Sequence, residues 1–205
     1  MSKTLFGALA GLALLGASAQ AGQAPVPSQP APEVRAGAYT LDKSHAKILW
    51  STSHFGFSTY HGEFTKFDAQ LTLDPARPER SRLVVDVDTR SISTNDPALD
   101  KHLNAPDFFN TAKFPGATFR STAVRRTGPA AASVTGDLTL LGVTRPVTLD
   151  VTFNKAGENP VSKAYTAGFS AEGVIRRTEF GMSTYAPAIG DQVKLTISGE
   201  FNPAC

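Results

Sequence analysis

The chain has 205 residues, and its charges nearly balance: 20 Lys and Arg residues against 18 Asp and Glu residues give a formal net charge of +2. The positive residues are scattered, so the sequence lacks the basic stripe with which nucleic-acid-binding proteins neutralise phosphates. The sole cysteine, Cys205, is the last residue, which excludes an intramolecular disulfide and leaves open a disulfide-linked homodimer.

Residues 1–21 have the pattern of a secretory signal peptide. Lys3 gives a basic start, residues 5–16 form an apolar run too short to span a membrane, and small residues follow at A-x-A spacing. Residues 22–37 are rich in Pro, Ala and Gln and predict a disordered tether. We therefore expect export to the periplasm and one mature domain over residues 38–205, with no apolar run long enough for a transmembrane helix.

The mature domain begins with three segments in which apolar and polar residues alternate, as in half-buried strands: residues 46–54, 67–74 and 82–92. Ile48 and Trp50 share one face of the first segment. Turn-forming residues such as Asp74-Pro75 separate the segments.

A helical pattern interrupts the strands. Asn95 and Asp96 are both candidate N-caps, and Pro97 suits the first helical position. We expect a short helix over about residues 97–104 and a half-turn around residues 107–109.

Five alternating segments follow the helix: residues 117–124, 134–140, 147–153, 164–171 and 192–201. In the third of them, Val147, Leu149 and Val151 share one face, and Thr and Asp residues occupy the other. Gly128-Pro129, Gly142 and Gly190-Asp191 provide turns between segments.

The pattern predicts an all-β fold, an eight-stranded antiparallel barrel with one or two short helices, because closure removes the exposed edges of long strands. A two-sheet sandwich is the alternative. Polar residues along the other strand faces favour an apolar interior facing away from water. Side chains can fill such an interior or leave room for one small ligand. Small inward residues, Ala69 and Ala167 among them, favour room for a ligand.

Several motifs recur in one order along the domain. They are Tyr39-x-x-Asp42, His45, His54 with Gly56, Gly62-x-Phe64-x-x-Phe67, Thr94, Asp107-Phe108-Phe109, Pro115 with Phe119, Gly136-Asp137-Leu138-Thr139, Gly142-Val143-Thr144, Pro146-Val147, Arg177-x-x-Phe180-Gly181-Met182 and Gly190-Asp191. In this order and spacing the chain, from about Tyr39 to Phe201, resembles the YceI-like proteins, a periplasmic polyisoprenoid-binding group with a lipocalin-like barrel. The resemblance implies a bound isoprenoid chain, such as a polyprenyl lipid or a quinone tail, and no cofactor.

The inward faces of the strands give the expected ligand-binding residues. These are Ile48, Trp50, His54, Phe64, Phe67, Leu83, Val85, Val87, Phe119, Leu138, Leu140, Val147, Leu149, Val151, Phe169, Arg177, Leu195 and Ile197. His54 either donates a hydrogen bond to the ligand's head group or is a structural histidine bonded within the protein. Arg177 either meets a phosphate or braces a loop through backbone carbonyls.

Other chemistry is less well supported. His45, His54, His61 and His102 form no metal-binding motif, so we expect no metal site. There is no G-x-S-x-G nucleophile motif, and we expect no enzymatic activity. The favoured function is binding, transport or storage of an isoprenoid lipid or quinone. The alternatives are a scavenger of hydrophobic stress compounds or antibiotics and a small lipid-modifying enzyme that uses His54.

Overall fold

The computed structural model describes residues 34–204, so the predicted signal peptide, most of the tether and Cys205 lie outside the described residues. The strands are β1 (Gly37–His54), β2 (Ser58–Phe64), β3 (Phe67–Leu73), β4 (Arg82–Asp88), β5 (Ile92–Ser93), β6 (Gly116–Gly128), β7 (Ala131–Leu140), β8 (Val143–Glu158), β9 (Tyr165–Arg176) and β10 (Gln192–Pro203). The helices are α1 (Pro97–Leu103) and the short 3-10 helices η1 (Pro78–Arg80), η2 (Thr89–Ser91) and η3 (Arg177–Phe180).

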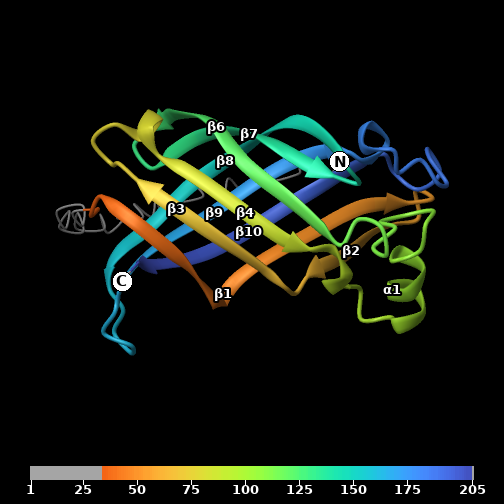
Figure 1. Ribbon diagram of the computed structural model, residues 1–205, viewed down its shortest axis with the longest axis horizontal. Helices are drawn as coiled ribbons and strands as arrows, with labels where there is room; N and C mark the ends of the chain where they lie inside the picture. The colour runs from red at the N-terminus through yellow and green to blue at the C-terminus, as the bar shows by residue number, and fades with distance from the viewer. Residues whose placement is uncertain (1–33, 205) are drawn as a thin grey trace, which may run out of the picture. The chain divides into compact units, whose positions relative to one another are not determined.

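The strands form a closed, eight-stranded antiparallel barrel, as the alternation predicts (Figure 1). Ten strands reduce to eight positions around the barrel, because β2 and β3 succeed one another along β1, and β5 continues the line of β4 beside β2. Pairing of β10 with β1 closes the ring, so the sandwich alternative is wrong.

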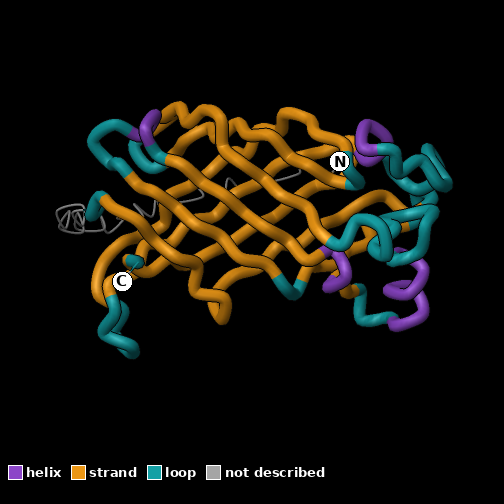
Figure 2. Tube along the Cα trace, in the orientation of Figure 1, coloured by secondary structure: helices purple, strands orange, loops and turns teal. Residues whose placement is uncertain are grey.

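Helix α1 forms where the sequence predicts it, and its N-cap is Asp96. The Asp96 side chain accepts hydrogen bonds from the backbone N–H groups of Ala98 and Leu99. Helices α1, η2 and η3 lie at one end of the barrel, hereafter the helix end, and η1 lies at the opposite end (Figure 2).

The barrel is filled with side chains at the end opposite the helices. Tyr39, Ala167 and Phe201 belong to a buried cluster there, and the Phe169 and Phe201 rings meet edge to face with centroids 6.0 Å apart. We call this region the filled end; its buried members are Tyr39, Ala69, Ala156, Ala167 and Phe201. Aromatic rings from neighbouring strands pack against one another in the interior here.

The last residues of the predicted tether belong to the packed domain, which corrects the expected disorder at this point. Val34 packs against the filled end, and the backbone N–H of Arg35 donates to the Tyr165 hydroxyl. The guanidinium of Arg35 also lies over the Tyr165 ring, 4.2 Å from its centroid. These contacts hold the chain against the barrel before β1 begins.

Candidate ligand-binding cavity

The helix end of the barrel encloses a cavity of about 390 Å³ with a mainly apolar wall. The strands supply Ile48, Trp50, Thr52, His54, Tyr60, Phe64, Val85, Val87, Ala117, Phe119, Leu138, Leu140, Val147, Leu149, Ile175, Val193, Leu195 and Ile197. The cap supplies Phe55, Leu99, His102, Leu103, Phe108, Phe109, Arg177, Met182, Tyr185 and Ile189. A volume of this size is typical of sites that bury a small apolar ligand.

Fourteen of the eighteen residues expected at the site line this cavity (18 − 4 = 14), and Phe67, Leu83, Val151 and Phe169 do not. Phe169 lies at the filled end, and Leu83 and Val151 pack against core residues instead. Strand alternation says which side of the wall a residue faces but not how far along the barrel it lies, so it could not separate these residues from the others.

Phe67 departs from the expected site for a local reason. Thr65 and Lys66 separate β2 from β3. The backbone N–H of Thr65 donates to the Ser91 carbonyl, and that of Lys66 donates to the Ser91 hydroxyl. Phe67 follows this break directly and borders a separate depression that is lined by charged residues such as Asp88.

Sequence reasoning missed the residues of the cap other than Arg177. Leu99 and Leu103 of α1 reach the cavity together with Phe108 and Phe109, because α1 and the turn after it cover the helix end. The four-residue spacing of the two leucines and the paired phenylalanines were the available sequence signals. Read as a connection between strands, the segment gave no reason to assign it to the site.

The loop from η3 to β10 forms the other part of the cap, and Arg177 holds it. Arg177 is 4% exposed, and its Nε, Nη1 and Nη2 groups donate four hydrogen bonds, each 2.9 Å long, to backbone carbonyls. The acceptors are the carbonyls of Gly190, Met182, Thr184 and Ile189. Burial lowers the pKa of Arg177, partly offset by the charge of Asp191. Of the two roles considered for Arg177, these contacts match the brace.

The rim of the cavity carries exposed aromatic residues. Phe55 and Tyr185 line the cavity and are 50% and 58% exposed, so the cavity reaches solvent here. The backbone N–H of Phe55 donates to the Ala188 carbonyl at 2.9 Å, which ties the β1–β2 turn to the loop. Phe57, at the tip of the same turn, is 91% exposed.

Polar groups in the wall come mainly from β1 and β2. The Thr52 hydroxyl is within bonding distance of the Gly190 and Gln192 carbonyls and is used within the protein. The His54 ring lies edge-on to Phe55, with centroids 4.7 Å apart. The Trp50 indole Nε1 is buried and meets no hydrogen-bond partner among the described residues.

Glycines let two large side chains lie back against the wall. At Gly62 of β2, a Cβ atom would lie 2.2 Å from Cζ2 of Trp50, its partner on β1. At Gly136 of β7, a Cβ atom would lie 2.4 Å from Cζ of Phe119. Both distances are impossible for real atoms, so each ring occupies the space that a side chain would need.

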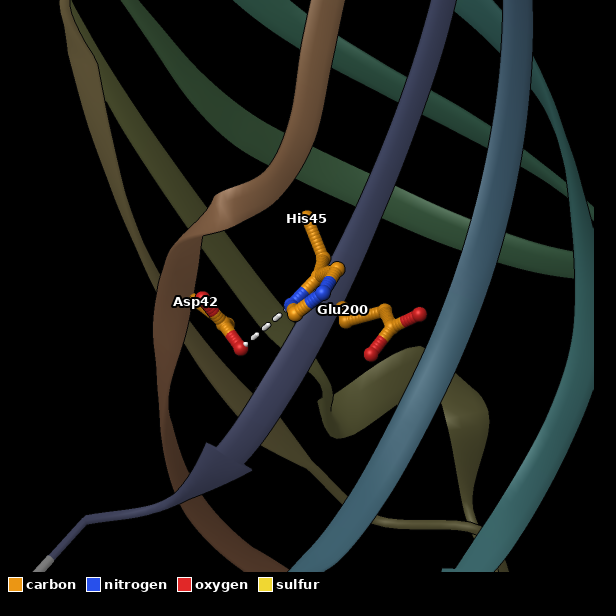
Figure 3. A group of neighbouring side chains, drawn as sticks. All are labelled: Asp42, His45 and Glu200. Atoms are coloured by element: carbon orange, nitrogen blue, oxygen red, sulfur yellow. Dashed lines mark hydrogen bonds and ion pairs between the residues drawn. The ribbon is translucent and has the colours of Figure 1, made fainter. Parts of the chain in front are cut away.

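A second polar group lies away from the cavity. Asp42 and His45 of β1 and Glu200 of β10 bring donor atoms within 4.8 Å of one another (Figure 3). It is the one such group of His, Cys, Asp and Glu in residues 34–204 that could hold a metal ion. A register shift in β1 between Asp42 and Lys47 brings the three side chains together. Asp42 and His45 are among the recurring motif positions, but alternation cannot reveal such a shift and so did not place Glu200 beside them.

Asp42 and His45 already bond to each other, with Oδ2 and Nδ1 2.9 Å apart. Hydrogen bonds from the Ser44 hydroxyl and from His45 lower the pKa of Asp42 to about 2. The hydrogen bond and charge of Asp42, with a further contribution from Glu200, raise the pKa of His45. The pair is therefore an ion pair wherever Asp42 is deprotonated and His45 is protonated, and it lies in the bulge of β1.

Comparison with known proteins identifies the family. A model of the YceI-like domain matches residues 39–201. The chain belongs to the YceI-like family. A UPF0312 protein of Pseudomonas fluorescens is 44% identical over 170 residues, covering 82% of this chain and 88% of its own length.

Solved structures share the barrel. The crystal structure of Burkholderia cenocepacia BcnA has a TM-score of 0.71 at 26% identity, and the alignment covers 78% of this chain and 98% of BcnA. A polyisoprenoid binding domain from Saccharophagus degradans has a TM-score of 0.62 at 12% identity, covering 83% of this chain and 100% of that domain, which shows a common fold. No helix within residues 34–204 combines the length and hydropathy needed to cross a bilayer.

Proposed function

We propose that this protein binds a long apolar molecule, an isoprenoid lipid or quinone, in its cavity and carries or stores it in the periplasm. The observation that carries the proposal is the 390 Å³ cavity with a mainly apolar wall at the helix end. Burying about ten CH₂ groups contributes roughly 8 kcal/mol gross, at ~0.8 kcal/mol for each group. That gain corresponds to about micromolar affinity before the costs of association, and a longer chain offsets those costs.

The family supports the class of ligand, and the sequence supports the compartment. The S. degradans domain of the same fold is a polyisoprenoid binding domain. Residues 1–21 have the pattern of an export signal, which is the basis for proposing the periplasm. Fractionation of cells that express the full chain tests this location: recovery in the cytoplasm with an intact N-terminus would contradict it.

We propose a binding protein rather than an enzyme. The ionisable side chains that line the cavity are His54, His102, Arg177 and two tyrosines, Tyr60 and Tyr185. Arg177 is held by backbone carbonyls, and His54 contacts aromatic rings. A general acid or base needs a partner that orients and tunes it, and neither of these two side chains has this arrangement. His102 does face a carboxylate, with its Nε2 3.5 Å from Oδ2 of Asp107, but both side chains are nearly half exposed at the rim.

Native mass spectrometry of the protein purified from the periplasm, followed by organic extraction, tests the proposed ligand. We expect a prenyl chain to copurify or to be taken up by the delipidated protein. Ala117→Leu is the matched disruption, since Ala117 is buried in the cavity wall, and Ala38→Leu is its control on an exposed position of β1. A protein that never takes up a prenyl chain would overturn the proposal.

The scavenging alternative shares the cavity, so the same preparation distinguishes it from a dedicated carrier. Displacement of a bound prenyl lipid by unrelated apolar antibiotics at similar concentrations would favour scavenging. A preference for the prenyl chain over antibiotics of equal hydrophobicity is the result we expect.

A further inference from the structure

Within residues 34–204, the exposed aromatic side chains all lie at the rim of the cavity, which is formed by the β1–β2 turn and the loop from η3 to β10. Phe55 and Phe57 of the turn are 50% and 91% exposed, and Tyr185 of the loop is 58% exposed. Every other Phe, Tyr and Trp of this range is buried or half-buried. Single exposed apolar residues are common on proteins, but three rings gathered at one opening indicate an interaction surface.

The backbone holds two of these rings in fixed positions. Phe55 and Tyr185 have φ angles of 52° and 58°, in the left-handed region that bulky residues rarely adopt. Such strain persists where neighbouring contacts fix the chain, and it is found most often at functional sites. Here the Phe55 N–H donates to the Ala188 carbonyl at 2.9 Å, and the Ile189 N–H donates to the Tyr185 carbonyl at 2.8 Å. The turn and the loop therefore form one connected rim (Figure 1).

The charges around the rim nearly balance. With histidines counted as neutral, residues 54–58, 94–115 and 176–191 carry four Lys and Arg residues against five Asp and Glu residues (4 − 5 = −1). Some of these charges are also used within the protein: Asp191 pairs with Arg176, and Arg177 is held by backbone carbonyls. Such a surface does not draw a strongly acidic or basic partner by long-range attraction, and it suits a zwitterionic one.

The exposed apolar area of the rim is small for a protein partner. An aromatic side chain buries about 150–250 Å² when it is fully covered, and Phe55 and Tyr185 are already half-covered. The three rings therefore supply less than the ~800 Å² on each side that a stable protein–protein interface buries. A phospholipid bilayer makes no such demand, because aromatic side chains enter its head-group region singly and bind it reversibly.

We propose that the rim is a membrane-docking surface, on which Phe55, Phe57 and Tyr185 enter the head-group region of a zwitterionic phospholipid bilayer. The mouth of the cavity then faces the lipid, and an apolar molecule passes between the bilayer and the cavity without crossing water. The docking surface goes beyond the proposed function, because its most exposed residue, Phe57, does not line the cavity and docking needs no bound ligand.

Cosedimentation with vesicles of phosphatidylcholine and phosphatidylethanolamine tests this surface. The proteins are purified from the periplasm, and their N-termini are verified to be identical, since an uncleaved apolar run would bind vesicles by itself. We expect the wild type to bind and Phe57→Ser to bind about tenfold more weakly, because the variant loses the apolar area that the ring inserts.

Val161→Ser is the matched control. Val161 is 90% exposed, but it lies between β8 and β9, next to strand residues that pack at the filled end. The control should bind vesicles within about twofold of the wild type, because single exposed apolar residues away from an interaction surface contribute little. An equal loss of binding in Phe57→Ser and Val161→Ser would overturn the proposal.

The salt dependence separates ring insertion from charge attraction. Raising the NaCl concentration from about 50 mM to about 500 mM screens surface charges and should change the vesicle affinity of the wild type by less than about twofold. Partial replacement of the lipid by anionic phosphatidylglycerol should have an equally small effect. Binding that requires the anionic lipid, or that disappears at high salt, would contradict docking on a zwitterionic bilayer.

The remaining outcomes separate docking from the proposed function. Failure of the wild type to sediment with any of these vesicles would overturn the docking surface, and so would self-association of the protein that Phe57→Ser abolishes. Uptake of a prenyl chain from ethanol solution, measured without vesicles, tests the function alone, and Phe57→Ser should take up the chain as the wild type does. Docking without uptake would contradict the function and support the surface, and uptake without docking would do the reverse.

Fluorescence provides a measurement that does not depend on a loss of binding. The chain has one tryptophan, Trp50, so the difference in emission between Phe57→Trp and the wild type reports on the rim. Vesicles should shift this added emission to shorter wavelength, and lipids that carry bromine on their acyl chains should quench it. Val161→Trp should show neither effect. Added emission from Phe57→Trp that does not respond to vesicles would overturn the proposal.

Discussion

Strand β8 runs along both ends of the barrel, and the interior that it faces differs between them. Its inward residues Val147 and Leu149 line the cavity at the helix end. Phe153, farther along the same face, packs against Phe169 at the filled end, with the two rings tilted and their centroids 5.6 Å apart. The apolar stripe is continuous, so the alternation that places it inside does not decide whether the interior is filled.

The difference depends on aromatic rings and on the cap. Ala167 and Ala156 are 0% and 1% exposed at the filled end, because rings such as Phe201 cover them. The expectation that small inward residues leave room for a ligand is therefore wrong for Ala69 and Ala167. The helix end also carries aromatic side chains, Trp50, Phe64 and Phe119 among them, but there they line a cavity, which α1 and the loop held by Arg177 cover.

The largest effect should come from emptying the filled end. Phe201→Ala is expected to lower the free energy of unfolding by about 3–5 kcal/mol, because the ring is 7% exposed and packs against Phe169. Urea unfolding measures the change. The affinity for a prenyl chain should remain within about twofold of the wild type at temperatures where the variant is folded. A large loss of affinity would show that the two ends are not independent.

Replacing one buried alanine by leucine at each end should distinguish the filled end from the cavity more sharply. Ala167→Leu adds volume where none is free and should destabilise the protein by about 1–3 kcal/mol. Ala117→Leu adds the same volume to the cavity wall and should cost less than about 1 kcal/mol while strongly weakening ligand binding. Chemical denaturation and ligand displacement give both quantities. Equal destabilisation by the two variants would contradict the distinction between filled and hollow ends.

The pH dependence of stability tests the part of β1 that lies between the two ends of the barrel. This part runs from Tyr39, at the filled end, to Ile48, which lines the cavity. The Asp42–His45 pair lies in this bulge. The pKa of Asp42 is lowered from 3.8 to about 2, so its stabilising effect is present above pH ~4 and is lost as pH falls toward 2. The pKa of His45 is raised from 6.5, so its effect is complete below that value and is lost as pH rises through the raised pKa.

His45→Gln should therefore differ most from the wild type between about pH 4 and pH 6.5 in its free energy of unfolding. The effect should be modest, because the His45 side chain is largely exposed. Urea unfolding at a series of pH values measures it. A difference between the two proteins that does not change with pH would show that the ion pair contributes nothing.

The smallest effect is expected at the rim. Phe57→Ser should change the free energy of unfolding by less than about 0.5 kcal/mol, because the ring is 91% exposed. Thermal and chemical denaturation are sufficient to check this. A larger loss would mean that the β1–β2 turn depends on this ring for its structure.

Much of the fold was readable from the sequence, and the limits have physical causes. Alternation identified most of the barrel strands but not β2, and Asp96 and Pro97 marked the helix, because these patterns depend on neighbours in the sequence. The cavity cap, including Phe108, depends on contacts between distant segments. The cluster of Asp42 and Glu200 depends on a register shift that no local pattern records.

The glycines against which Trp50 and Phe119 lie affect the width of the cavity. The width of the cavity depends partly on the absence of a side chain at Gly62 and Gly136. A Cβ atom at either position would force the ring off the wall and into the cavity, with no substitution among the residues that line the cavity. A substitution outside the cavity wall would therefore change the size of the molecules that fit the cavity.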